Sequence, residues 1–271
     1  MLVALYLFAF LAVPDSLECE VLPVAVTQGH VIDRDVRGRL FIIDARGLLI
    51  ADSSHSVFYW DDPIVPVGAL TDVKVEGGLR IWLAAPEEQL LLMLSPDLRI
   101  LHVLSSSQET VYGYAVTHTE QDIRPRFVLP WLAGSILFYD ELTTYLWVWN
   151  YNSRELSLFM VPDEPLEKVV SLAPDKIGGL ARDGRTWYVW SASGDQEKTV
   201  LPVSLQGIRF TGERLIGFTE NRVWLLDSNV WLLPSIAEPI RDVLLIDDSS
   251  LLVLTRNHLN RCNLKQIAAF E

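Results

Sequence analysis

The sequence predicts an all-β protein in which one sheet unit is repeated and the repeats close into a ring. Three observations predict it: a strand–turn–strand pattern recurs at a nearly constant step, helical periodicity is scarce, and half of the 271 residues are apolar. A unit with two apolar faces cannot bury both by itself, so neighbouring units must stack. We therefore expect residues 1–271 to form a single domain.

Seven copies of the unit are recognisable, and their spacing identifies the fold. They begin near Leu2, Leu40, Leu79, Ile136, Ile177, Leu215 and Leu251, in steps of 38, 39, 57, 41, 38 and 36 residues. This period matches one four-stranded blade of a β-propeller, and it resembles the repeat period of WD40-like propellers. We expect seven blades, with six as the alternative. Open first and last blades would expose strand edges, so the N- and C-terminal segments should pair to close the ring.

The first apolar run, Leu2 to Val13, is interpreted as a buried strand. No Lys or Arg occurs before Arg34, and no Ala-x-Ala cleavage pattern follows the run, so it lacks the marks of a signal peptide. Twelve apolar residues are also too few for a membrane-spanning helix. The sequence therefore predicts a cytoplasmic protein without membrane insertion.

The second and third units show the expected strands. Residues 39–52 form a hairpin in which Gly47 can adopt the positive φ of the turn, and the third unit offers strands at 72–76, 79–84, 89–94 and 98–103. Two segments, Pro86 to Leu94 and Leu264 to Phe270, also fit short helices. The long step that follows the third unit predicts an inserted loop or hairpin around residues 105–126.

The later units continue the pattern to the C-terminus. Strands are expected at 135–139, 144–149, 155–161, 177–181, 186–190, 215–218, 222–226, 230–233, 243–246, 251–255 and 259–264. Between two of these strands, Gly184-x-Thr186-Trp187 resembles part of the Asp-box turn of sialidase-like propellers. This resemblance implies a locked hairpin turn at Asp183 and no activity.

Charge and cysteine content exclude several classes of partner. A net charge of -13 and a pI near 4.8 repel phosphate backbones, so nucleic acid is not an expected partner. Two cysteines, Cys19 and Cys262, are too few for a disulfide framework. We expect two separate buried thiols, although closure of the ring could bring them together.

The motifs of common enzyme classes are missing from the sequence. It contains no phosphate-binding Gly-x-x-x-x-Gly-Lys loop, no Gly-x-Ser-x-Gly elbow, and no His-Glu-x-x-His or paired Cys-x-x-Cys zinc pattern. No catalytic residue, metal site or cofactor is therefore assigned. The densest polar group, His30 with Asp33, Arg34 and Asp35, is interpreted as a loop salt-bridge cluster, with cation binding or acid–base chemistry as the alternative.

These observations predict a noncatalytic scaffold that binds other protein subunits within a larger assembly. Aromatic and arginine side chains dominate binding hot spots, and loops on rigid folds carry function, so the candidate partner-binding residues come from one strand and from the insertion. They are Trp147, Trp149, Tyr112, Tyr114, His118, Arg124 and Arg126. The alternative is a glycan-binding or hydrolytic propeller with an acidic site at the mouth of the central channel.

Overall fold

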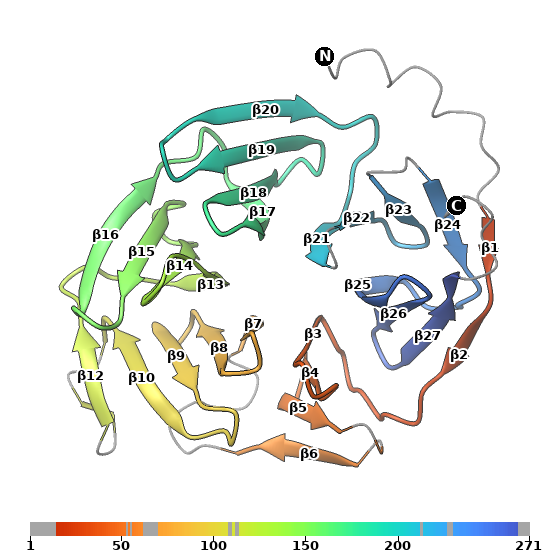
Figure 1. The fold of residues 1–271 in the computed structure, drawn as a ribbon, viewed down its shortest axis with the longest axis horizontal. Coiled ribbons are helices and arrows are strands. Elements are labelled where there is room, and N and C mark those ends of the chain that lie inside the picture. The colour runs from red at the N-terminus through yellow and green to blue at the C-terminus, as the bar shows by residue number, and fades with distance from the viewer. Residues whose placement is uncertain are drawn as a thin grey trace.

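The protein is a ring of six β-sheets around a central channel (Figure 1). The computed structural model describes residues 15–264 apart from 53, 55, 62–69, 108–109, 112–113, 212–213 and 227–229. Within this part of the chain every regular element of four or more residues is a strand. The predicted strand at Leu2 to Val13 and residues 265–270 of the second possible helix lie outside the described residues.

Each sheet is one blade, and we number the blades in chain order. Blade 1 comprises β3 (Val31–Arg34), β4 (Leu40–Asp44), β5 (Gly47–Ala51) and β6 (Val57–Trp60); blade 2 comprises β7 (Asp72–Glu76), β8 (Arg80–Ala85), β9 (Leu90–Leu94) and β10 (Ile100–Ser105), with β12 (Tyr114–His118) and β11 (Thr110–Val111) at its outer edge. Blade 3 comprises β13 (Pro125–Pro130), β14 (Ser135–Asp140), β15 (Leu146–Asn150) and β16 (Glu155–Met160); blade 4 comprises β17 (Leu166–Ala173), β18 (Lys176–Ala181), β19 (Thr186–Ser191) and β20 (Gln196–Val200). Blade 5 comprises β21 (Gly207–Thr211), β22 (Arg214–Phe218), β23 (Val223–Leu225), β24 (Val230–Pro234) and β1 (Asp15–Leu17); blade 6 comprises β25 (Ile240–Asp247), β26 (Ser250–Thr255), β27 (Leu259–Asn263) and β2 (Cys19–Val21).

The two ends of the chain close the ring, as the sequence predicts. Strand β2 pairs antiparallel with β27, and β1 lies parallel to β24 on the neighbouring blade (Figure 1). Cys19 lies opposite Cys262 in this pairing, and a disulfide joins the two residues. The expectation of two separate thiols is therefore wrong. Three paired residues and one covalent bond hold blade 6 closed.

The prediction of seven blades is wrong, because the described residues form six sheets and the N-terminal strands β1 and β2 join blades 5 and 6. The last blade has only three strands from the C-terminal part of the chain, and β2 supplies its fourth. The other six predicted starting points, from Leu40 to Leu251, all fall at or within one residue of the second strand of a blade. The residues of the long step include the β11–β12 hairpin, which extends blade 2 beyond its fourth strand.

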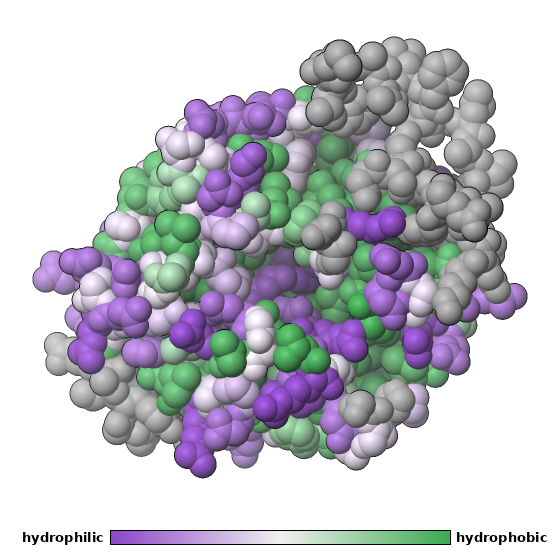
Figure 2. All heavy atoms as spheres, viewed as in Figure 1, coloured by the Kyte–Doolittle hydropathy of each residue, from purple (hydrophilic) through white to green (hydrophobic). Residues whose placement is uncertain are grey.

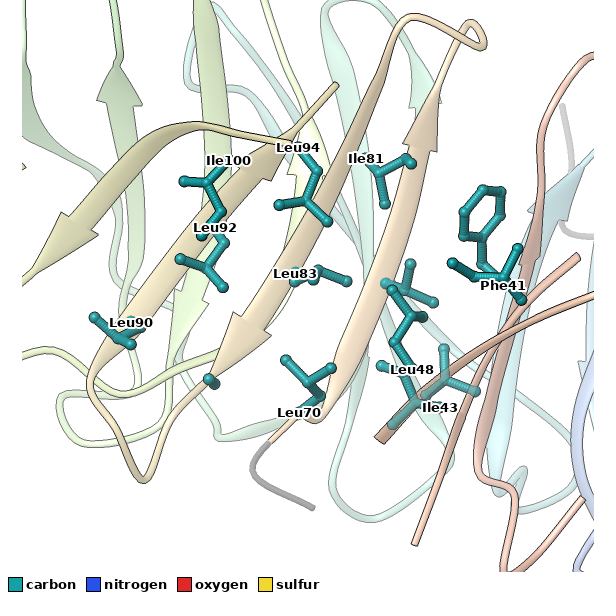
Figure 3. Close-up of a cluster of buried hydrophobic side chains, with 14 of the residues drawn as sticks. Phe41, Ile43, Leu48, Leu70, Ile81, Leu83, Leu90, Leu92, Leu94 and Ile100 are labelled. Carbon is teal, nitrogen blue, oxygen red and sulfur yellow. The ribbon is translucent and has the colours of Figure 1, made fainter. Parts of the chain in front are cut away.

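The core consists of six apolar clusters, one between each pair of adjacent blades. Figure 3 shows the cluster between blades 1 and 2, where Leu48 of β5 packs near Leu83 of β8. Leu49, the next residue of β5, packs instead against blade 6. Burial of one such side chain contributes about 1.5–3 kcal/mol. Because both faces of each sheet are covered, the second strand of each blade, such as β4 or β8, is mostly one apolar run without polar alternation.

This double burial also explains why one predicted helix is wrong. Residues 90–94 form β9, whose five apolar side chains are all buried, and a turn precedes the strand at 86–89. An apolar run of this length has no clear period, so a buried strand and a buried helix look alike in sequence.

The turn between β18 and β19 is locked by one carboxylate. Asp183 accepts hydrogen bonds from the backbone N–H of Arg185 (2.7 Å) and from the backbone N–H and hydroxyl of Thr186 (both 2.8 Å). Gly184 has a φ of 70°, which glycine adopts without steric cost. The segment that resembles an Asp-box therefore holds a hairpin turn.

Candidate functional site

The innermost strand of each blade begins at the same end of the channel, and an irregularity in the ladder marks the beginning of each. In blades 3, 4 and 6 the inner strand has a β-bulge whose extra residue is Arg126, Glu167 or Arg241. In blades 1, 2 and 5 the residue before the strand donates its backbone N–H to the strand alongside; these residues are His30 (3.1 Å), Thr71 (2.9 Å) and Gln206 (2.8 Å). Bulges commonly redirect a side chain at a rim or an active site.

These six residues form a ring that we call the mouth ring. One residue comes from each blade, and all six line the same cavity of about 270 Å³. His30, Gln206 and Arg241 are exposed to solvent, whereas Thr71, Arg126 and Glu167 are half-buried. Figure 2 shows hydrophilic side chains around the hollow at the centre of one face of the molecule. The mouth ring therefore brings polar side chains from all six blades together at one cavity.

A second hollow, of about 420 Å³, adjoins the mouth ring beside blade 5. His30, Glu167, Gln206 and Arg241 line both spaces, and Arg182 joins them here. Leu205, Phe218 and Ile240 supply the apolar part of its lining, beside these five polar residues. Volumes of this size accommodate a small molecule.

The mouth ring contains one ion pair and several groups outside it. Arg126 donates from Nη2 to Glu167 Oε1 at 3.2 Å, and its Nη1 lies 3.8 Å from Glu141 Oε1. Neither Arg182 nor Arg241 has a carboxylate of the described residues within 4.0 Å. The mouth therefore presents two cationic groups that no neighbouring acid neutralises.

His30 carries the titratable base of the mouth ring. Desolvation by the surrounding protein lowers the pKa of His30 below its ordinary value of 6.5, while the backbone of Gln28 and Leu70 partly opposes the shift. The charge of Lys168 lowers this pKa further, and that of Asp242 raises it. At neutral pH the imidazole is uncharged and can accept a proton.

Below the mouth ring, carboxylates bind three of the inner strands to the inner strand of the following blade. Three aspartates accept the backbone N–H of a residue on the following blade: Asp242 from Ile32 (2.9 Å), Asp33 from Val75 (2.9 Å) and Asp72 from Val128 (3.0 Å). These bonds satisfy donors at the inner edge of the sheets that no further strand could pair with. The aspartates below the mouth are therefore structural groups.

Buried cations balance these carboxylates. Arg209 donates from Nε to Asp242 (2.7 Å), from Nη2 to the same carboxylate, and from Nη2 to the carbonyl of Ile32 (3.0 Å). Burial alone would raise the pKa of Asp242, but the charge and hydrogen bonds of Arg209 overcome this effect and lower it. Lys168 Nζ lies 3.3 Å from Asp72, and Arg209 Nη1 is buried without a hydrogen-bond partner in the described structure.

Lys74 is the least compensated charge of this layer. Desolvation and the nearby charge of Arg209 lower the pKa of Lys74 to about 8, although Asp33 and Asp72 act in the opposite direction. Lys74 is half-buried on β7, two residues along the strand from Asp72.

The structure separates the residues that the sequence singled out for partner binding. Trp149 is completely buried between blades 2 and 3, and Trp147 is half-buried beside it. His118 and Arg124 are exposed, Tyr114 lies on β12, and Tyr112 lies outside the described residues. Arg126 is the one member of the set at the channel mouth. The buried ring of Trp149 leaves no surface on which a partner could dock.

Sequence reasoning missed most of the mouth ring. His30 was noticed only within a cluster that the structure disperses, since Asp33 bonds to Val75 and Asp35 forms an ion pair with Arg39 at 2.6 Å. Thr71, Glu167, Gln206 and Arg241 carry no motif. The available signal was positional, because each of them lies at or next to the first residue of an inner strand.

The described residues contain no group of three or more His, Cys, Asp or Glu side chains placed to hold a metal ion. Across the same part of the chain, no helix has the length and apolar character needed to cross a membrane.

The fold defines the chain as a six-bladed β-propeller, and solved propellers with enzyme names are similar to it. Virginiamycin B lyase from Staphylococcus aureus superposes with a TM-score of 0.67 at 10% identity, over 92% of this chain and 99% of that one. A gluconolactonase from Xanthomonas campestris gives 0.62 at 13% identity, over 90% and 89%. YCF48 bound to a D1 peptide gives 0.62 at 11% identity, over 94% and 100%. No protein-family model and no curated protein sequence matches the chain.

These comparisons correct the functional prediction. The noncatalytic scaffold is wrong as the first interpretation, because the lyases and gluconolactonases among the similar structures support the hydrolytic alternative better than a scaffold. Identities of this size establish the fold alone, and function must be argued from the site. The site also differs from the acidic cluster of that alternative, since Glu167 is the single carboxylate of the mouth ring.

Proposed function

We propose that this propeller is an enzyme that hydrolyses or eliminates a C–O bond in a small molecule held at the channel mouth. The observation that carries the proposal is the position of His30, whose pKa is lowered by desolvation, in a cavity lined by one polar residue from every blade. The lyase and gluconolactonase names among similar propellers support this class of chemistry.

The proposed base is His30, and its environment suits the role. A general base works best when its pKa lies near or below the operating pH, so that its acceptor form predominates. Desolvation provides this condition by lowering the pKa of His30. The imidazole is exposed in the cavity, so a substrate or a water molecule can reach it.

Both reactions need the same two groups. In hydrolysis, His30 takes a proton from water as the water oxygen bonds to the acyl carbon, and returns it to the leaving oxygen as the C–O bond breaks. In elimination, His30 takes a proton from carbon, the C–H electron pair becomes the new C=C bond, and the C–O pair leaves with oxygen. Arg126, held by Glu167, offers N–H donors to the oxygen on which negative charge develops.

The test is a substrate panel with a matched pair of variants. The purified protein would be incubated with γ- and δ-lactones and with streptogramin B compounds, and products would be identified by mass spectrometry. We expect turnover of at least one class, loss of about 100-fold or more in kcat/KM for His30→Ala, and full activity for His118→Ala, which alters an exposed histidine on β12.

The pH profile gives an independent reading of the same proposal. The kcat/KM of the natural protein should fall on the acid side with an inflection below 6.5, because protonation of His30 removes the base. Equal activity of His30→Ala and the natural protein would refute the assignment of the base. Absence of turnover across the panel would refute the enzyme proposal for these bonds.

A further inference from the structure

We infer that the mouth selects organic carboxylates with an apolar body. The inference rests on the proposed function in one respect, namely that such a ligand is also a substrate. The carboxylate would bind between Arg182 and Arg241, and the apolar body would lie against Leu205, Phe218 and Ile240. All five residues line the second hollow beside blade 5.

The first argument is the state of the two arginines. Arg182 follows β18 of blade 4 and Arg241 lies in the bulge of β25 in blade 6, so they approach the hollow from either side of blade 5. Both are exposed, and neither forms an ion pair within 4.0 Å with a described carboxylate. Arginine presents a rigid fork of donors that matches a carboxylate in two parallel hydrogen bonds.

The second argument is the charge around the hollow. Glu167 is its one acidic lining residue, and Arg126 already engages the Glu167 carboxylate at 3.2 Å. The lining therefore has a positive balance, although the whole chain carries a net charge of -13. A local cationic cleft on an acidic protein concentrates anions there while the remaining surface repels them.

The third argument is the wall that faces these cations. Leu205, Phe218 and Ile240 are at most 5% exposed, and their contacts with the rest of the core hold them in place. The backbone N–H of Gln206 donates to the carbonyl of Phe218 at 2.8 Å, so the backbone at Gln206 is held against the strand that contains Phe218. A preformed lining that combines apolar and charged groups selects a ligand that has both an apolar part and a charge.

The inference is tested by calorimetric titration with 4-phenylbutyrate and with its neutral counterpart 4-phenylbutanol. We expect the carboxylate to bind at least about tenfold more tightly than the alcohol. Arg241→Gln and Arg182→Gln should each weaken binding of the carboxylate by about tenfold or more, without a comparable effect on the alcohol. Arg154→Gln is the matched control, because Arg154 is an exposed arginine in the β15–β16 turn and lies outside both hollows.

The outcomes separate this inference from the proposed function. Selective binding without turnover of any substrate would sustain the carboxylate site and overturn the enzyme proposal. Turnover of a substrate without any preference for a carboxylate ligand would sustain the enzyme proposal and overturn the carboxylate site. Equal affinity for the acid and the alcohol, or no binding of the acid at about 10 mM, overturns the inference.

Discussion

The disulfide between Cys19 and Cys262 should be the largest single contribution to the stability of the ring. It joins residues that are 243 positions apart, so it constrains almost the whole chain in the unfolded state. The loop-entropy relation for a closure of this length corresponds to about 5.5 kcal/mol at 25 °C. Domains are commonly stable by only about 5–15 kcal/mol. Replacement of both cysteines by serine should therefore remove a large share of the free energy of unfolding.

The assay is urea unfolding of the oxidised protein, the reduced protein and the Cys19→Ser/Cys262→Ser variant. The midpoint should fall in the reduced protein and in the variant by similar amounts, and a reductant should leave the variant unchanged. Without the disulfide, the closure of blade 6 depends on three paired residues of β2 and β27. A difference in the free energy of unfolding below about 1 kcal/mol would refute the reasoning, since the entropic effect would then be absent.

This disulfide also bears on where the protein is found. Disulfides persist in oxidising compartments and are rare in the cytosol. The cytoplasmic location that the sequence suggests stays a prediction, and labelling of free thiols in protein taken directly from its host measures it. A cytoplasmic pool should contain both cysteines reduced.

Two further predictions concern the charges below the mouth. Lys74→Met should raise the free energy of unfolding at pH 7 by up to about 3 kcal/mol, because the folded state depresses the pKa of Lys74 from 10.5 to about 8 and so holds its proton less tightly than the unfolded chain. For the same reason, the destabilisation by Lys74 disappears as the pH rises from 8 to 10.5, so the gain from Lys74→Met should shrink at pH 10. Lys176→Met, at an exposed lysine, is the control. An equal gain from Lys74→Met at pH 7 and pH 10 would contradict the lowered pKa of Lys74. Asp242→Asn should lower the free energy of unfolding in urea by about 3–5 kcal/mol, because it leaves the buried Arg209 charge uncompensated. Arg209→Met combined with Asp242→Leu should recover most of this loss. If it does not, the lost hydrogen bond from the Ile32 backbone N–H accounts for more of the destabilisation than the unpaired charge does.

The repeat could be recognised from the sequence because the blades bury most of each second strand. The starting points at Leu40, Ile136, Ile177, Leu215 and Leu251 fall in such strands, and a glycine or an aspartate precedes each of them by two or three residues. The number of blades could not be deduced in the same way. The fourth strand of blade 6 comes from the opposite end of the chain, and a count of units along the sequence cannot show which segments share a sheet.

The mouth ring could not be predicted from local sequence, because its members share a place in the ring and not a residue type. His30 and Arg126 were noticed for other reasons, and Glu167, Gln206 and Arg241 were not noticed at all. Arg126, Glu167 and Arg241 reach the mouth through bulges, and a bulge is one extra residue whose presence is revealed only by the register of the neighbouring strand.

The two layers of the channel differ in how far they can change without harm to the fold. The buried aspartates each accept a backbone N–H of the next blade, so a substitution there removes a bond between blades. The mouth-ring side chains at the bulges, such as Arg241, belong to residues that the ladder leaves unpaired. Substitution of an unpaired and exposed side chain typically changes stability by less than about 0.5 kcal/mol. Variants of the mouth ring should therefore fold, and a loss of binding in Arg241→Gln can be attributed to the guanidinium itself.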